Sequence, residues 1–339
     1  MSETRRDFLL ATGATLLATE IPRSAAAASG TTGEIPRRKL GKTGVEVSIL
    51  GVGGSHLGET KDEAEAIRIV QEAIDAGVTF FDNAWEYHDG LSEERLGKGL
   101  RGRRDKAFLM TKVCTHGRDA GVAMQQLEES LRRLQTDHLD LWQVHECIYY
   151  DDPQRHFAPG GVIAALDKAK QQGKVRFVGF TGHKHPDIHL AMLKHDYPFD
   201  TCQMPLNCFD GAGFRSFEKN VLPEVNRRGM AALGMKSLGG NGEPAQKGAV
   251  TPEEAIRYAM SLPVATTITG IDSLEVLRQN LGIARGFRPM PAPALAALRK
   301  RVAGYAEDGA LELYKTSKKF DAKVGRAQHG YPPPEELPL

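Results

Sequence analysis

The sequence predicts a single-domain α/β fold, a TIM (β/α)8 barrel, because strand-like and helix-like segments alternate along most of its length. Eight strand–helix units can be recognised, the number that closes a parallel barrel. The chain has 339 residues, of which 41% are hydrophobic and 26% are charged. That length accommodates the roughly 250 residues of a typical barrel, but it would be tight for two domains with linkers.

The first predicted units after the amino-terminal region lie between residues 63 and 111. Residues 63–76 have the apolar spacing of an amphipathic helix, and Gly77 is a helix-stop signal. A strand is expected at 78–82, a helix opens at Ser92, and another strand is expected at 107–111. Later helices are expected at 124–134 and 161–172, and later strands at 138–144, 175–180, 201–204, 230–235 and 265–269.

Polar residues stand at the ends of three successive predicted strands. Asp82 ends the strand at 78–82 and is followed by Tyr87, while Lys112 and His145 follow the strands at 107–111 and 138–144. Singly, such residues often cap a turn, pack in a core or make an ordinary hydrogen bond. Because parallel strands of a barrel end on one face, the four side chains can meet there. Their joint placement favours a proton-transfer site.

The chemistry of carbonyl reduction explains why these four residue types belong together. A carbonyl that accepts hydride becomes an alkoxide, so the site needs an acid near the oxygen and fixed positive charge around it. Tyr87 is a weak acid, and a neighbouring Lys112 ammonium is expected to lower its pKa. Asp82 would hold the lysine charged and oriented, and His145 could donate to the substrate oxygen or relay a proton.

The ordered motifs resemble those of the aldo-keto reductase family. The resemblance covers residues 36–285 and runs through Arg38-Lys-Leu-Gly-Lys-Thr-Gly-Val-Glu-Val-Ser-Ile-Leu-Gly-Val-Gly-Gly54, Asp82-Asn-Ala-Trp-Glu-Tyr87, Thr111-Lys112, His145 and Gly270-Ile-Asp-Ser-Leu-Glu-Val-Leu-Arg-Gln-Asn280. It implies an NAD(P)-dependent oxidoreductase that transfers hydride between a nicotinamide cofactor and a carbonyl or alcohol, such as an aldehyde, ketone or sugar. It also implies that Asp82, Tyr87, Lys112 and His145 form the catalytic tetrad, without a metal, and that Tyr87 is the general acid.

The cofactor site is expected at the last units of the barrel. No Gly-x-Gly-x-x-Gly follows the first strand, where a Rossmann fold would need it. Barrels often bind phosphate in the loops after strands seven and eight. There, residues 237–242 offer unobstructed backbone amides and residues 270–280 lead into a helix N-terminus. With the resemblance, the expected cofactor contacts are Gln203, at the nicotinamide carboxamide, and Ser237, Leu238, Gly240, Gly270, Asp272, Gln279 and Asn280.

The choice between NADP and NAD depends on charges near the adenosine ribose. NADP is the default that the resemblance implies, and NAD is also possible. Asp272 would repel a 2′-phosphate and could instead bind a ribose hydroxyl, whereas Arg278 could restore the balance.

Two competing functions belong to other classes. His183, His185, His189 and His195 could contribute to a metal site, which would suit a metal-dependent lyase or hydrolase on the same barrel. Against this, residues 186–194 have the pattern of an amphipathic surface helix. The second competitor is a catalytically inactive, reductase-like binding subunit, although a binding role needs no acid at Tyr87.

The amino terminus is expected to be a targeting segment outside the fold. Paired arginines at 5–6, a weakly apolar stretch and small residues at 24–29 resemble a bacterial twin-arginine (Tat) export signal over residues 1–30. The expected location is therefore periplasmic or otherwise exported, through the Tat machinery, or cytoplasmic if the signal is not functional. Since nicotinamide nucleotides are scarce outside the cytoplasm, we hypothesise that the exported protein retains its cofactor.

The rest of the sequence adds constraints. The net charge of +1 marks no nucleic-acid partner, and no membrane span is expected in the mature chain. The four cysteines lack a Cys-x-x-Cys spacing; a bridge between Cys114 and Cys147 is conceivable, but thiols are expected.

The barrel is assigned to residues 36–290, and a carboxyl-terminal helix and tail to 291–339. In the family that the sequence resembles, such a tail commonly crosses the barrel mouth, which makes Phe320, His329 and Tyr331 candidates for substrate selection; packing outside the barrel is the alternative.

Overall fold

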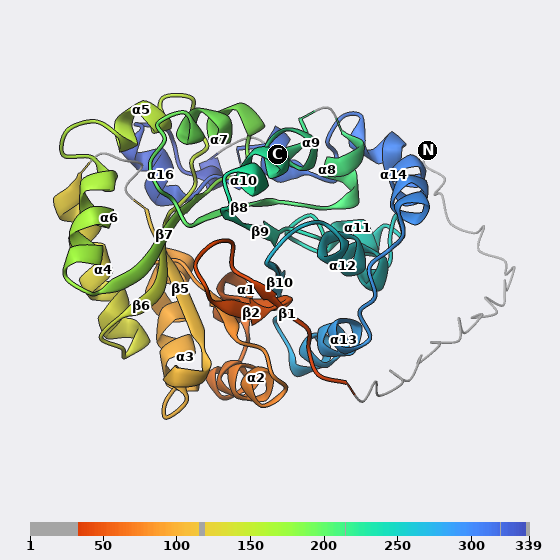
Figure 1. Cartoon of the computed structure of the whole chain (residues 1–339), viewed down its shortest axis with the longest axis horizontal. Helices are drawn as coiled ribbons and strands as arrows, with labels where there is room; N and C mark the ends of the chain where they lie inside the picture. Colours follow the sequence, from red (N-terminus) through yellow and green to blue (C-terminus); the bar gives the residue numbers. More distant parts are fainter. Residues whose placement is uncertain (1–32, 115–118, 214, 319, 337–339) are drawn as a thin grey trace, which may run out of the picture.

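A computed structural model describes residues 33–114, 119–213, 215–318 and 320–336. Eight parallel strands close into a barrel in the order β10-β3-β4-β5-β6-β7-β8-β9, which confirms the predicted TIM barrel (Figure 1). The barrel strands are β3 Leu50–Gly53, β4 Phe80–Asp82, β5 Phe108–Val113, β6 Leu139–Val144, β7 Val175–Thr181, β8 Thr201–Pro205, β9 Ala231–Met235 and β10 Thr266–Gly270. All their carboxyl ends therefore lie on one face.

Helices surround the barrel and connect its strands (Figure 1). They are α1 Gly54–Glu59, α2 Glu63–Asp75, α3 Leu91–Gly99, α4 Ala120–Leu134, α5 Asp152–His156, α6 Val162–Gln171, α7 Pro186–Leu193, α8 Cys208–Ala212, α9 Phe217–Asn220, α10 Leu222–Arg227, α11 Glu243–Gln246, α12 Pro252–Ser261 and α13 Leu274–Arg285. Short 3-10 turns lie at η1 Tyr87–Gly90, η2 Arg104–Lys106 and η3 Pro334–Glu336. Within the described residues, none of the helices is both long and apolar enough to cross a bilayer.

The amino-terminal end of the barrel is closed by a hairpin of β1 Arg37–Lys39 and β2 Glu46–Ser48. This hairpin brings Leu40 and Val47 into one buried cluster with Phe80 and Phe108 of the barrel strands. The Phe80 and Phe108 rings stack with their centres 5.3 Å apart. A larger cluster fills the space between the strands and the outer helices. Since the hairpin blocks this end, the polar strand ends on the opposite face are left to form a site.

The helix predicted at 124–134 begins four residues earlier, at Ala120. Asp119 explains the difference, because its carboxylate accepts hydrogen bonds from the backbone N–H groups of Gly121 and Val122 at 2.6 and 3.0 Å and so caps the helix. The helix ends at Leu134, as predicted. A helix start that depends on a capping side chain is harder to predict from the sequence than the apolar face of the helix.

The carboxyl-terminal segment forms α14 Ala292–Ala306, α15 Leu313–Thr316 and α16 Lys323–Gln328. Helix α14 packs against α8. Ion pairs hold this segment: Lys315 of α15 lies with its Nζ 2.6 Å from Asp210 Oδ1 in a buried pair, and the partly buried Lys184 Nζ lies 2.6 Å from Oδ1 of Asp321, just before α16. This segment thus returns to the face that carries the strand ends.

Candidate active site

Lys112 and Asp82 form a buried ion pair between neighbouring strands. Lys112 Nζ lies 2.5 Å from Asp82 Oδ1 and donates a 2.7 Å hydrogen bond to the Asn83 carbonyl. The Lys112 side chain is 1% exposed and the Asp82 side chain 6%. Two acceptors bind the buried ammonium and fix its direction.

Tyr87 is placed beside this pair by a tight turn after β4. Its backbone N–H donates to the Ala84 carbonyl at 3.1 Å, and Lys112 Nζ lies 3.4 Å from the phenol oxygen. Burial, followed by the carboxylates of Asp82 and Glu86, raises the phenol pKa of Tyr87 well above its usual value. The net shift is therefore upward, because burial and the neighbouring carboxylates outweigh the lowering that was expected from Lys112. The phenol is protonated at neutral pH.

His145 directly follows β6 and completes the group. Its ring centre lies 5.6 Å from that of Tyr87, edge to face, and Glu86 Oε1 lies 2.5 Å from His145 Nδ1. Burial lowers the pKa of the His145 imidazole, so the ring is neutral at pH 7. A carboxylate at Nδ1 favours the tautomer with its proton there, which leaves Nε2 as a hydrogen-bond acceptor.

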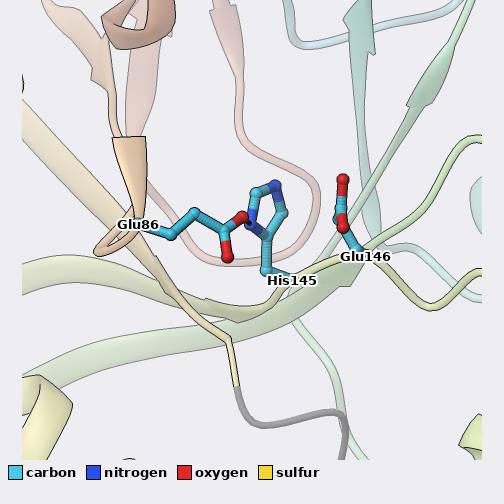
Figure 2. A group of neighbouring side chains, drawn as sticks. All are labelled: Glu86, His145 and Glu146. Atoms are coloured by element: carbon cyan, nitrogen blue, oxygen red, sulfur yellow. Dashed lines mark ion pairs between the residues drawn. The ribbon is translucent and has the colours of Figure 1, made fainter. Parts of the chain in front are cut away.

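A second carboxyl group, Glu146, lies on the other side of His145. Figure 2 shows the imidazole between the carboxyl groups of Glu86 and Glu146, whose ligand-type atoms lie within 4.8 Å of one another. Glu146 has a left-handed backbone (φ 51°), and burial, then Glu86, raises its carboxyl pKa well above the usual value. Its Oε2 accepts a 2.8 Å hydrogen bond from the Ala322 N–H, so the tail reaches the residue next to His145.

The three tail residues singled out in the sequence lie in two places. The Phe320 ring centre is 5.7 Å from Lys236 Nζ, beside the end of β9. The rings of His329 and Tyr331 instead pack against Tyr149, with centres 3.8 and 5.5 Å from it. Only Phe320 therefore approaches the expected cofactor loops.

The glycine loop after β9 has the backbone geometry of an anion site. Gly239, Gly240 and Gly242 all have positive φ, at 72°, 93° and 76°, which favours glycine. Within the described residues, the backbone N–H groups of Ser237, Leu238 and Gly240 donate to no acceptor, whereas that of Gly239 donates to the Lys236 carbonyl at 3.0 Å. Free amides of this kind fit the pyrophosphate of a nicotinamide nucleotide.

The other expected cofactor residues lie on the neighbouring strands β8 and β10 and on α13. Gln203 is buried in β8 and Asn280 is buried in α13, where its amide donates to Thr269 Oγ1 at 3.2 Å. Asp272 and Gln279 are exposed. Gly270 has a packing role, because a side chain there would collide with His56. The order β8-β9-β10 places these segments side by side.

The charges around the start of α13 are mainly negative. The Leu274 N–H donates to the Glu65 carboxylate at 3.4 Å, next to the exposed Asp272. Arg278, which was expected to restore the balance, instead pairs with both carboxylate oxygens of Glu72, at 2.7 and 2.9 Å. Its positive charge is therefore already compensated.

The histidine-rich segment does not assemble a metal site in the described part of the chain. His183 and His189 are buried, His185 caps α7 and His195 is exposed. The two groups of side chains close enough to share an ion, Glu86–His145–Glu146 and Asp151–Asp152–His329, contain none of them. Cys114 and Cys147 are not joined, and all four cysteines are thiols.

Three residues of the site were missed in the sequence: Glu86, Glu146 and Lys236. Glu86 and Glu146 are the immediate neighbours of Tyr87 and His145. Their position and their acidic side chains could have identified them as candidate site residues. Lys236 ends an apolar strand in the same way as Lys112. The pattern that identified the tetrad, a polar residue at the end of an apolar strand, would also have identified Lys236.

The comparison with known families agrees with this geometry. The profile of the aldo/keto reductase family matches residues 49–247. The chain belongs to the aldo/keto reductase family. Its relatives include aldo-keto reductase YhdN of Bacillus subtilis (strain 168), 32% identical over 216 residues, and L-galactose dehydrogenase of Arabidopsis thaliana, 36% identical over 161 residues. These alignments cover 59% and 44% of the chain and only 61% and 49% of the two relatives.

Solved structures of the family share the barrel. The holo form of aldo-keto reductase AKR11C1 from Bacillus halodurans superposes with a TM-score of 0.67 at 25% identity, covering 79% of this chain and 96% of that one. An aldo-keto reductase from Klebsiella pneumoniae, solved in complex with NADP and acetate, superposes with a TM-score of 0.62 at 23% identity, covering 76% of this chain and 93% of that one. At this level of identity, the similarity to the Klebsiella pneumoniae enzyme shows a shared fold.

Proposed function

We propose that this member of the aldo/keto reductase family catalyses NAD(P)-dependent hydride transfer between a nicotinamide cofactor and a carbonyl or alcohol, such as an aldehyde, ketone or sugar. The observation that carries the proposal is the buried group in which Lys112 Nζ lies 2.5 Å from Asp82 Oδ1 and 3.4 Å from the Tyr87 hydroxyl. A binding subunit would not need a buried ion pair aimed at a phenol.

Each side chain of this group has a role in moving one proton. The cofactor, when bound, supplies or accepts the hydride. The protonated Tyr87 phenol donates its proton to the carbonyl oxygen during reduction, and its phenolate takes the proton back during oxidation. Lys112 stabilises the phenolate formed in the first case, and Asp82 keeps the ammonium in position.

His145 is proposed to orient the hydroxyl of an alcohol substrate rather than to act as the acid. Its imidazole is neutral because burial lowers its pKa, and Glu86 fixes the ring from the Nδ1 side at 2.5 Å. With the proton on Nδ1, Nε2 accepts a hydrogen bond from the hydroxyl of an alcohol substrate but has no proton to donate to a carbonyl oxygen. A doubly protonated ring is not needed, because Tyr87 already carries the proton.

The cofactor is proposed to be NADP, with NAD as a possible alternative. Support comes from membership of the family and from the unpaired amides of Ser237, Leu238 and Gly240 after β9. We propose that Gln203 contacts the nicotinamide, and that Gly270, Asp272, Gln279 and Asn280 surround the adenosine end.

A turnover screen tests this function. Purified protein is incubated with panels of aldehydes, ketones and sugars and with NADPH or NADH, in the presence and absence of a metal chelator. We expect nucleotide-dependent turnover of at least one class that survives the chelator. Turnover that needs an added divalent metal and no nicotinamide nucleotide would instead support the lyase or hydrolase.

We also propose that residues 1–30 are a twin-arginine export signal and that the Tat machinery carries the folded protein to the periplasm. These residues lie outside the described part of the chain, so support comes from the paired arginines, the apolar stretch and the small residues alone. If the signal is not functional, the enzyme acts in the cytoplasm.

A further inference from the structure

Asp151, Asp152 and His329 form a cluster outside the catalytic group. Asp152 begins α5, in the segment after β6, whereas His329 directly follows α16 in the carboxyl-terminal tail. One ligand-type atom from each of the three side chains lies within 4.8 Å of the other two. The Asp152 side chain is fully buried, that of His329 is 5% exposed and that of Asp151 is half-exposed. A segment of the barrel and the tail thus meet at three side chains of the kinds that bind metals.

The imidazole of His329 is held so that its Nε2 atom faces the two carboxylates. Its Nδ1 atom lies 3.0 Å from the Gly325 carbonyl oxygen. Because that oxygen can only accept a hydrogen bond, Nδ1 carries the ring proton of the neutral imidazole and Nε2 has a lone pair. The ring packs on Tyr149, with ring centres 3.8 Å apart. A histidine that donates to a backbone carbonyl and turns its other nitrogen toward carboxylates has the arrangement of a metal ligand.

Each aspartate is held through one oxygen and presents the other to His329. Asp151 Oδ2 accepts a hydrogen bond from Arg155 Nε at 2.6 Å, and Asp151 Oδ1 lies 3.7 Å from His329 Nε2. Asp152 Oδ2 accepts two successive backbone N–H groups of the loop after β6, both at 2.9 Å, and its Oδ1 lies 3.5 Å from the same nitrogen. All three side chains are therefore oriented by hydrogen bonds of their own, as metal ligands are.

The separations within the cluster fit ligands around one ion better than a direct ion pair. A protonated imidazole that donates to a carboxylate lies about 2.7–2.9 Å from the oxygen, whereas the two distances here are 3.5 and 3.7 Å. Nitrogen and oxygen atoms bound to a tetrahedral zinc ion, at about 2.0–2.2 Å from the metal, lie about 3.3–3.6 Å from one another. Two carboxylates and a nitrogen lone pair that converge on one point also repel one another unless a cation lies between them.

We propose that Asp151, Asp152 and His329 bind one divalent transition-metal ion of the zinc type, which ties the tail to the loop after β6. One imidazole nitrogen and two carboxylate oxygens suit such an ion, with water in the remaining position. The ion is structural. It takes no part in the transfer of hydride or of the proton, so this site is independent of the proposed function.

The ion acts on the tail and not on the reacting atoms. The tail contacts the candidate active site through the Ala322 N–H, which donates to Glu146 Oε2 at 2.8 Å. Farther along the same tail, His329 attaches it to the two aspartates. Loss of the ion therefore loosens the tail while the tetrad keeps all its side chains. Turnover that survives a chelator agrees with both proposals.

A zinc titration of metal-free protein tests the site. The full-length wild-type protein, His329→Phe and Asp151→Asn are treated with a chelator, dialysed and titrated with Zn²⁺ in a calorimeter. We expect one tight site in the wild type and binding at least about 100-fold weaker in each variant, more than the 10–100-fold cost of disturbing a residue behind a ligand. His329→Phe keeps a ring against Tyr149, and Asp151→Asn changes a half-exposed side chain, so both variants should fold.

His138→Phe is the matched control. The exposed His138 imidazole lies 2.6 Å from Asp137 but belongs to no three-residue group of this kind in the described part of the chain. This variant should bind zinc like the wild type. Zinc should also slow proteolytic cleavage of the tail in the wild type and the control, but not in His329→Phe. Wild-type binding no tighter than that of His329→Phe would overturn the proposal and leave a protonated imidazole between the carboxylates. Tight binding that left the tail equally open to cleavage would overturn the role assigned to the ion.

Discussion

Tyr87 can act as an acid in reduction because its surroundings oppose loss of its proton. Burial and the carboxylates of Asp82 and Glu86 raise its phenol pKa well above the usual value, while Lys112, 3.4 Å away, is close enough to stabilise the phenolate once it forms. The same residue must give up its proton in one direction and recover it in the other. We therefore expect the balance between phenol and phenolate, on which Lys112 and Asp82 act, to determine how the rates of reduction and oxidation depend on pH.

This balance predicts opposite pH dependences for the two directions. Below its raised pKa the Tyr87 phenol is protonated. Titration of Tyr87 should therefore not lower the rate of reduction anywhere in the neutral pH range. Oxidation needs the phenolate, so its rate should rise steadily as the pH increases toward that pKa. Steady-state rates in both directions across the pH range measure this. A reductive rate that falls with an apparent pKa near neutrality would argue against Tyr87 as the acid.

At the scale of elements, the amino-terminal end of α13 presents a cluster of negative charge. Asp272 is exposed, Glu65 contacts the Leu274 N–H at 3.4 Å, and Arg278 is held by Glu72. A 2′-phosphate at this helix end would gain from the backbone amides but meet these carboxylates. We therefore expect this element to weaken NADP binding without abolishing it.

Asp272→Ser should therefore increase the preference for NADP over NAD by about fivefold, the upper range for an exposed charge pair. Affinities for both nucleotides are measured by titration. Glu94→Gln is the control, because this exposed acid lies on α3, which packs against α2 and α4, and it should leave the ratio unchanged. Identical ratios in the wild type and Asp272→Ser would place Asp272 away from the 2′ position.

The helix α15 is tied to the barrel by a buried ion-pair network. Lys315 Nζ lies 2.6 Å from Asp210 Oδ1 and 2.9 Å from Glu312 Oε1, with all three side chains at most 4% exposed. Asp210 in turn accepts the Phe217 N–H at 2.9 Å. Through Lys315, α15 is joined to the segment that follows β8.

Lys315→Met should lower the free energy of unfolding by about 3 kcal/mol or more, because it leaves two buried carboxyl groups without their cation. Urea denaturation measures this change. Lys323→Met, which removes an exposed pair with Glu335 at 3.1 Å, should have little effect. Equal small effects of both variants would show that the network around Lys315 does not stabilise the fold.

The sequence predicted the strands and the tetrad because both rest on short local patterns. Apolar runs that end in Asp82, Lys112 and His145 place these residues at the carboxyl ends of the barrel strands. This placement does not depend on the conformation of the loops. The pairing of Arg278 with Glu72 was not predictable, since the two residues are 206 positions apart and meet only when α13 packs beside α2. The pKa direction of Tyr87 was missed for a related reason, because burial by distant segments leaves no local signal.

At the scale of the whole molecule, the tail and the proposed export signal point to one property, a cofactor that stays bound. Tyr314 and Phe320 lie against Lys236 at the glycine loop, and Ala322 is bonded to Glu146. The tail thus packs over the expected cofactor site. An enzyme exported in its folded form could keep its nucleotide where none is available outside.

Protein isolated from the periplasmic fraction and then denatured should release nicotinamide nucleotide in near-stoichiometric amount. Chromatography of the released nucleotide measures this, with the same protein made without residues 1–30 as the cytoplasmic control. Its reaction would then have to be redox-neutral overall or use a second substrate to reset the cofactor. An empty periplasmic protein, or protein found only in the cytoplasm, would contradict retention after export.

The central claim, that Tyr87 is the general acid of a nicotinamide-dependent carbonyl reduction, is tested most directly by the rate of the chemical step. Wild-type protein and Tyr87→Phe are each loaded with NADPH and mixed with an excess of a carbonyl substrate found in the screen, and oxidation of the nucleotide is followed in a single turnover. The account predicts a rate at least about 100-fold lower in Tyr87→Phe, the usual contribution of a general acid, with unchanged NADPH affinity. A variant that oxidises bound NADPH as fast as the wild type would contradict it.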